Sequence, residues 1–210
     1  MIKVVIFDFD DTIYTGKTWD NWPDYLFKYL RKVLKKDFES FCKKYEIKKD
    51  VNTRDVVLWL DKEGYDVKKF NRLYQTMLCK HSPNVKVLPD EFFKKLSEKH
   101  PLYIVSMSPQ RYLKYYTKKY KVNRKYFKEL QSLNFLGEVK SKSVNYIDIM
   151  KKENVCAEEV LVVGDNYKHD IVPAIELGIN VIHFKGDHNQ IYDYFTEKEI
   201  LNCEEFKTAP

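Results

Sequence analysis

Residues 3–12 have the sequence KVVIFDFDDT, in which an unbroken apolar run leads directly into a group of carboxylates. A run such as Val4–Phe7, with no alternation of polar and apolar residues, is typical of a strand covered on both faces by helices. Three later segments have a similar character and complete the predicted set of strands: Leu102–Ser106, Val160–Val163 and Asn180–Phe184. The sequence therefore predicts an α/β fold with a doubly wound parallel sheet.

A long stretch separates the first predicted strand from the second, far more than the dozen or so residues of an ordinary crossover connection. Within it, apolar residues recur at helical spacing in several stripes: Trp22–Leu34, Phe38–Tyr45, Val56–Leu60 and Phe70–Leu78. We therefore predict a helical domain inserted at residues 16–84, with residues 1–15 and 85–210 forming the α/β core.

The composition is that of a globular protein. Of 210 residues, 44% are hydrophobic and only 6 are glycine and 7 proline, which argues against a disordered or fibrous chain. The charges, 37 Lys and Arg against 31 Asp and Glu, give a net charge of +6, a weak preference for anionic partners. Cysteines at 42, 79, 156 and 203 form no CxxC pair, which argues against a zinc site or a disulfide framework.

No segment has the roughly 18 uncharged apolar residues that a transmembrane helix requires, so we expect no membrane association. The first apolar run ends in aspartates and has no small-residue cleavage site after it, unlike a signal peptide. These features predict a cytoplasmic protein.

Polar side chains follow three of the predicted strands. Asp8, Asp10 and Asp11 follow the first, Ser106 ends the second, and the third leads into GDNYKHD, residues 164–170. The carboxyl ends of parallel strands meet at one edge of a sheet, so we expect these groups to lie together. Carboxylates this close raise one another's pKa unless a cation offsets them, and oxygen ligands suit a hard divalent metal.

These motifs, in this order, resemble those of the haloacid dehalogenase (HAD) superfamily, a group of mostly magnesium-dependent phosphatases with a Rossmann-like core. The first motif, DxDx(T/V), is similar to residues 8–12, and the second, a Ser or Thr that ends a strand, to Ser106. The acidic fourth motif matches Asp165 and Asp170. In this family a helical cap between the first and second motifs closes over the site, and residues 16–84 occupy that place.

The third motif, a lysine before a helix, has two candidates in the segment EVKSKS, residues 138–143. Lys140 has the spacing to Asp165 of a KPxPxxY pattern, with Tyr146 at its tyrosine. Both prolines of that pattern are replaced by serine. Lys142, placed just before the helix as in other relatives, is the alternative, and the spacing favours Lys140.

The resemblance implies a mechanism. Asp8 is the expected nucleophile, forming an aspartyl-phosphate, and Asp10 the expected general acid and base. Ser106 and Lys140 are expected to bind the phosphoryl oxygens. Mg²⁺ is the expected cofactor, held by Asp8, the backbone carbonyl of Asp10 and Asp165, with Asp170 supporting these ligands. The expected substrate is a small phosphorylated metabolite, either a sugar phosphate or a nucleotide.

Other functions are less consistent with these residues. An aspartate two residues after the nucleophile disfavours dehalogenation, because dehalogenating relatives lack it. A phosphoryl-transferring mutase and a non-catalytic binding module remain as alternatives. The basic, tyrosine-rich segment Arg111–Tyr120 is as well explained by a solvated helix as by nucleic-acid binding, so nucleic acid is disfavoured as a partner. The sequence determines neither the particular ester nor the oligomeric state.

Overall fold

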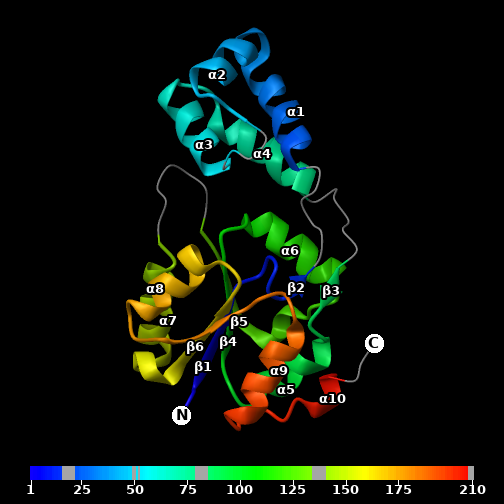
Figure 1. Ribbon diagram of the computed structural model, residues 1–210, viewed down its shortest axis with the longest axis vertical. Helices are drawn as coiled ribbons and strands as arrows, with labels where there is room; N and C mark the ends of the chain where they lie inside the picture. The colour runs from blue at the N-terminus through cyan, green and yellow to red at the C-terminus, as the bar shows by residue number, and fades with distance from the viewer. Residues whose placement is uncertain (16–21, 49–50, 52, 79–84, 134–140, 208–210) are drawn as a thin grey trace. The chain divides into compact units, whose positions relative to one another are not determined.

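The computed structural model describes residues 1–15, 22–48, 51, 53–78, 85–133 and 141–207 (Figure 1). Contacts divide these residues into two compact units. The core unit contains residues 1–15, 85–133 and 141–207, and the helical unit contains the described residues between 22 and 78.

The core unit is built on a parallel sheet with the strand order β5-β4-β1-β6-β7. These strands span Val4–Phe7 (β1), Leu102–Ser106 (β4), Phe127–Ser132 (β5), Val160–Gly164 (β6) and Asn180–His183 (β7). From the central β1 the chain proceeds to β4 and β5 on one side and then crosses to β6 and β7 on the other. The predicted doubly wound parallel sheet and its four strands are confirmed.

The fifth strand of this sheet, β5, was not predicted from the sequence. Its residues FKELQS include the exposed Lys128 and Glu129 and lack the continuous apolar run of the other strands. β5 pairs with β4 at the edge of the sheet, where side chains reach solvent. An edge strand therefore carries a weaker sequence signal than the buried central ones.

Helices cover both faces of the sheet. Helices α7 (Ser143–Glu153) and α8 (Val172–Ile175) lie on one side, and α5 (Asp90–Ser97) and α9 (His188–Glu197) lie on the other (Figure 1). On the first face, Tyr146 and Ile149 of α7 join a buried cluster with alternate residues of β1, β4 and β6. Burial on both faces explains why the central strands read as continuous apolar runs.

Aromatic side chains fill the other face of the sheet. The Phe7 ring of β1 meets the rings of Phe92 and Phe93 on α5, with centroids 6.4 and 5.5 Å away. Phe92 also contacts Phe195 of α9, at 5.7 Å between centroids, in an edge-on arrangement. Because buried aromatic rings remove a large apolar area from water, this layer contributes strongly to the stability of the core.

The strand register brings the polar strand ends together. Phe7 lies opposite Ile104 of β4 and opposite Val163 of β6. Asp8, Ser106 and Gly164 therefore all lie at the carboxyl edge of the sheet, at its topological switch point, where α/β proteins bind ligands.

A small antiparallel pair of strands adjoins this edge. β2 (Tyr14–Thr15) pairs with β3 (Lys86–Val87), with Tyr14 opposite Val87. The backbone N–H of Leu88 donates to the carbonyl of Ile13 at 2.9 Å and extends the pairing. The chain thus leaves the core and returns to it through neighbouring strands.

The helical unit has its own core. Its helices are α1 (Trp22–Leu34), α2 (Phe38–Lys44), α3 (Thr53–Lys62) and α4 (Val67–Leu78). They follow the predicted stripes. Leu26 and Leu30 of α1, Val56 and Leu60 of α3 and Phe70 of α4 belong to one buried cluster.

Two helices complete the core unit: α6 (Gln110–Lys119), after β4, and α10 (Glu204–Lys207), near the end of the chain. In the part of the chain that the structure describes, no helix has the length and apolar character needed to cross a membrane.

Phe92 tests the importance of the aromatic layer. Replacing this fully buried ring by alanine should lower the free energy of unfolding by about 3–5 kcal/mol, because the cavity it leaves cannot fully collapse. The control is Val144 on α7, which is 55% exposed. Val144→Ala should change the free energy of unfolding by no more than about 0.5 kcal/mol. Urea denaturation measures both, and similar losses in the two variants would contradict this role.

Candidate active site

Asp8 and Asp10 lie in the turn that follows β1. The backbone N–H of Asp8 donates to the carbonyl of Val163 on β6 at 2.8 Å, which continues the sheet pairing to this residue. Asp11 then adopts a left-handed conformation with φ of 52°, which aspartate tolerates better than most residues. The turn redirects the chain from β1 to β2.

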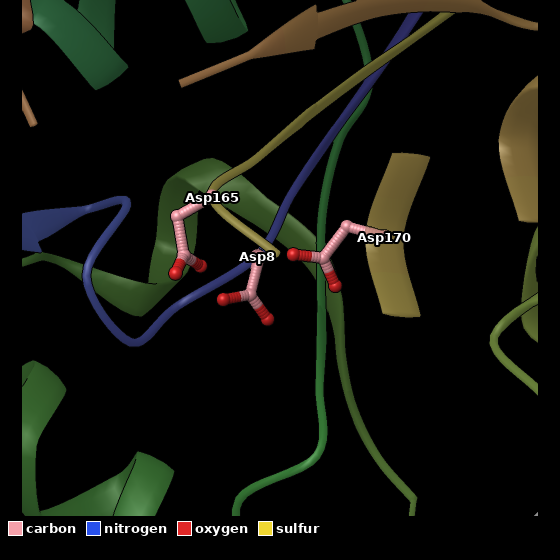
Figure 2. A group of neighbouring side chains, drawn as sticks. All are labelled: Asp8, Asp165 and Asp170. Carbon is pink, nitrogen blue, oxygen red and sulfur yellow. The ribbon is translucent and has the colours of Figure 1, made fainter. Parts of the chain in front are cut away.

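Three carboxylates converge at this edge of the sheet. Figure 2 shows the side chains of Asp8, Asp165 and Asp170 lying next to one another, and each offers an oxygen within 4.8 Å of the others. They come from the end of β1 and from the loop after β6. The structure thus brings together the first and fourth motifs of the sequence.

Lys142 compensates part of this negative charge. Its ammonium lies 2.5 Å from Asp8 Oδ1 and 2.6 Å from Asp170 Oδ1, and its side chain is only 1% exposed. Burial by itself would lower the pKa of Lys142, but the Asp8 and Asp170 carboxylates outweigh that effect and raise it. Lys142 therefore remains a buried cation at neutral pH.

The neighbouring carboxyl groups remain difficult to ionise. Burial, aided by repulsion from the surrounding aspartates, raises the pKa of Asp8, although Lys142 opposes this shift. Burial and repulsion from Asp170 raise the pKa of Asp165 to about 6, and burial and Asp165 raise that of Asp11 to about 7. The cluster thus has more negative charge than Lys142 offsets.

Both carboxylate oxygens of Asp170 contact other groups of the protein. Oδ1 contacts Lys142, and Oδ2 accepts a hydrogen bond of 2.9 Å from the backbone N–H of Asn166. Gly164 leaves room for this side chain, because a Cβ on Gly164 would lie only 2.6 Å from Asp170 Cβ. With both of its oxygens engaged, Asp170 orients Lys142 and the loop after β6.

Asp10 has hydrogen-bond partners on both of its carboxylate oxygens. Tyr14 donates its hydroxyl to Oδ1. On the other side, the hydroxyls of Ser108 and Ser106 donate to Oδ2, at 2.5 and 3.3 Å. Ser106 is fully buried, at the end of β4, and its Oγ accepts from the backbone N–H of Ser108 at 3.0 Å.

The structure describes only one of the two candidate lysines of the third motif. Lys140 lies outside the described residues, so its predicted place in the site stays a prediction. The lysine that the structure places against Asp8 and Asp170 is Lys142, the alternative. It directly precedes α7, whose Tyr146 hydroxyl donates to the carbonyl of Asp170 at 3.3 Å. This geometry favours Lys142 over Lys140 as the lysine of the third motif.

Sequence reasoning missed three residues around Asp10: Tyr14, Ser108 and Tyr112. Tyr14 follows the first motif by only two residues, but nothing in the sequence shows that its hydroxyl turns back to Asp10. Tyr112 lies 98 positions from Tyr14, yet their hydroxyl oxygens are 2.7 Å apart. A contact between residues so distant in sequence has no local pattern that reveals it.

The donor atoms fit a hard divalent cation such as Mg²⁺, which prefers carboxylate and carbonyl oxygens. Lys142 contacts Oδ1 of Asp8, which leaves the second oxygen of this carboxylate, Oδ2, available to a metal ion. Asp165, which accepts a long 3.4 Å hydrogen bond from Thr12, is the second carboxylate suited to such an ion. The raised carboxyl pKa values indicate that another positive charge would be favourable here.

Sequence comparison establishes the family. A profile of haloacid dehalogenase-like hydrolases matches residues 2–178. The chain therefore belongs to this family and is a hydrolase, as its motifs predicted. None of the curated proteins compared with the sequence matches it.

Solved structures share the fold at low sequence identity. A structure described as the HAD-hydrolase YfnB from Bacillus subtilis, bound to magnesium, is 16% identical, with a TM-score of 0.59 and coverage of 93% of this chain and 99% of that one. A predicted phosphoglycolate phosphatase from Haemophilus somnus is 18% identical (TM-score 0.54; coverage 86% and 84%). A 2-haloacid dehalogenase from Pseudomonas syringae is 20% identical (TM-score 0.51; coverage 88% and 86%).

The raised pKa values predict how stability depends on pH without metal. The unfolded carboxyl groups titrate near pH 4. Folded Asp165 titrates at about 6, so the folded state binds more protons and loses stability as the pH rises toward that value. Between about pH 5 and about pH 7 this loss should be about 0.5–1 kcal/mol, after a discount for solvent screening.

Urea denaturation in EDTA measures this effect, and the Asp165→Asn variant isolates it from other titrating groups. The variant should lose less stability than the wild type over the same pH interval. Equal losses in the two proteins would show that Asp165 does not titrate as described.

Proposed function

We propose that this protein is a magnesium-dependent phosphomonoester hydrolase that acts through an aspartyl-phosphate on a small phosphorylated metabolite. The observation that carries this proposal is the convergence of Asp8, Asp165 and Asp170 around a buried lysine. A carboxylate nucleophile, a metal-binding carboxylate and a fixed cation are groups that suit phosphoryl transfer through an aspartyl-phosphate. Substrate selection is assigned to the helical unit, by resemblance to the family's cap.

Asp8 is the proposed nucleophile. Lys142 contacts Oδ1, which leaves Oδ2 to attack phosphorus in line with the departing oxygen. The short contact fixes the orientation of the carboxylate before the substrate arrives, which lowers the entropic cost of reaching the transition state. Covalent transfer to Asp8 divides one difficult displacement into two easier steps.

Asp10 is the proposed general acid and base. It lies two residues beyond the nucleophile, and Tyr14, Ser106 and Ser108 all hydrogen-bond to its carboxylate. In the first step Asp10 protonates the leaving oxygen, and in the second it removes a proton from the water that hydrolyses the intermediate. The aspartate at this position is also the feature that disfavours carbon–halogen cleavage.

Ser106 and the motif lysine are the proposed phosphate ligands. The hydroxyl of Ser106 lies at the same edge of the sheet as Asp8 and donates to Oδ2 of Asp10. For the lysine, the contacts of Lys142 support this residue rather than Lys140. Its ammonium has three protons, enough to reach the carboxylates and a phosphoryl oxygen together.

The proposed metal ligands are the Asp8 carboxylate, the Asp10 backbone carbonyl and Asp165. When bound, Mg²⁺ supplies positive charge between nucleophile and phosphate and polarises the phosphoryl oxygens. Asp170 holds Lys142 and the loop that carries Asp165.

Phosphate release tests the proposed function. Wild type and Asp8→Asn are compared with p-nitrophenyl phosphate and a panel of sugar phosphates and nucleotides, in Mg²⁺ or in EDTA. We expect release that requires Mg²⁺ and falls by at least about a thousandfold in the variant, because asparagine cannot form the covalent intermediate.

The control is Asp193→Asn, on α9, where the carboxylate is half exposed and pairs with Lys207 away from the site. It should retain wild-type activity. If the folded wild type releases phosphate from none of these esters in Mg²⁺, or if Asp8→Asn retains activity, the proposal is wrong. Rapid isomerisation of a sugar phosphate with little hydrolysis would instead favour the mutase.

A further inference from the structure

Tyr14 forms a buried hydroxyl relay with Tyr112 that ends on the carboxylate of Asp10. The Tyr14 hydroxyl donates to Asp10 Oδ1 and lies 2.7 Å from the hydroxyl of Tyr112 on α6. A phenol has a single proton to donate. Tyr14 gives that proton to Asp10, and Tyr112, which also hydrogen-bonds to Asp10, lies against the same hydroxyl.

The relay is rigid. Tyr14 is 0% exposed and Tyr112 2% exposed. The Tyr14 ring packs at 72° against Phe9, with centroids 5.3 Å apart, and against Tyr120 at 5.0 Å. Its backbone is held by pairing with Val87 of β3. A hydroxyl fixed by both ring packing and strand pairing holds its partner oxygen in one place.

Both phenols keep their protons at neutral pH. Burial, together with the charge of Asp10, raises the pKa of Tyr14 and the pKa of Tyr112 well above the usual tyrosine value. Tyr14 donates its proton to Asp10 Oδ1. The other oxygen, Oδ2, faces two serine hydroxyls, which can rotate to accept a hydrogen bond as well as donate one, so a protonated Asp10 can carry its proton on Oδ2 without losing a partner.

Oδ2 is the oxygen that faces the end of β4. Ser106 and Ser108 contact it there, and Ser106 is the residue proposed to bind the phosphoryl group. With Tyr14 bound to Oδ1, the acidic proton of Asp10 can lie on Oδ2. This oxygen faces Ser106 and therefore the proposed position of the phosphoryl group and its leaving oxygen.

We propose that Tyr14, supported by Tyr112, is a positioning residue that directs the Asp10 Oδ2 proton to the leaving oxygen. This inference rests on the proposed phosphatase function and deepens it. As the bond from Asp8 Oδ2 to phosphorus forms, the bond from phosphorus to the leaving oxygen breaks. The Asp10 O–H bond breaks as the leaving oxygen gains the proton.

The step leaves Asp10 as a carboxylate. The hydrogen bond from Tyr14 becomes stronger as this negative charge develops, because hydrogen bonds to ionised acceptors are stronger than those to neutral ones. An interaction that strengthens along the reaction stabilises the transition state more than the bound substrate, and so accelerates the step. Losing the hydroxyl should therefore matter only where the leaving group needs a proton.

The experiment compares two esters that differ in that need. Phenyl phosphate has a poor leaving group, whereas dinitrophenyl phosphate has one that departs as an anion. For Tyr14→Phe we expect kcat/KM to fall about tenfold or more with phenyl phosphate and less than about twofold with dinitrophenyl phosphate. Since kcat/KM covers only the steps up to formation of the phosphoenzyme, later activation of water by Asp10 does not enter.

Two further variants provide reference points. Asp10→Asn should show the same selectivity with a larger loss. Tyr120→Phe is the matched control, because its ring contacts Tyr14 while its buried hydroxyl has no hydrogen-bond partner among the described residues. It should leave kcat/KM unchanged with both esters. Thermal unfolding confirms that each variant is folded.

If Tyr14→Phe does not fold, Tyr112→Phe replaces it, with the same selectivity expected and a smaller loss. An equal loss with both esters indicates a merely structural tyrosine and overturns the inference, as does an unchanged kcat/KM with phenyl phosphate. In either case the wild type still cleaves dinitrophenyl phosphate through Asp8, so the proposed function stands. A folded wild type that cleaves neither ester contradicts both.

Discussion

The ammonium of Lys142 lies between Asp8 and Asp170 with almost no exposure to water, and the chemistry of this edge of the sheet depends on that contact. Buried carboxylates without a cation would take up protons, and a protonated Asp8 could not act as the proposed nucleophile. Lys142 opposes that shift and at the same time fixes one oxygen of Asp8. The remaining excess of negative charge makes the site suitable for a divalent cation.

The parallel sheet is what brings these groups together. Asp8 follows β1, Ser106 ends β4 and Asp165 follows β6, and the register aligns these ends at one edge. Lys142 precedes α7 and reaches the same edge from one face of the sheet, whereas Tyr14 and Tyr112 come from β2 and α6. Asp8 therefore receives its cation, and Asp10 its hydroxyl donors, from separate segments.

The sequence predicts those parts of this arrangement that depend on neighbouring residues in the chain. The apolar runs before Asp8 and Asp165 identify buried strands, and their polar ends locate the site. Choosing between Lys140 and Lys142 depends on how the chain enters α7, which motif spacing does not determine. Two further features were not predicted from the sequence. The edge strand β5 is polar, and the contact between Tyr14 and Tyr112 joins segments that are distant in the chain.

The most direct test of the central claim is urea denaturation of Lys142→Met and Lys140→Met, without metal, at about pH 7 and about pH 5. Removing the buried cation should cost Lys142→Met about 3 kcal/mol at the higher pH. The loss should be smaller at the lower pH, where the carboxyl groups take up protons. Lys140→Met should stay within about 0.5 kcal/mol of wild type. A Lys142→Met variant as stable as wild type at about pH 7 would contradict the account.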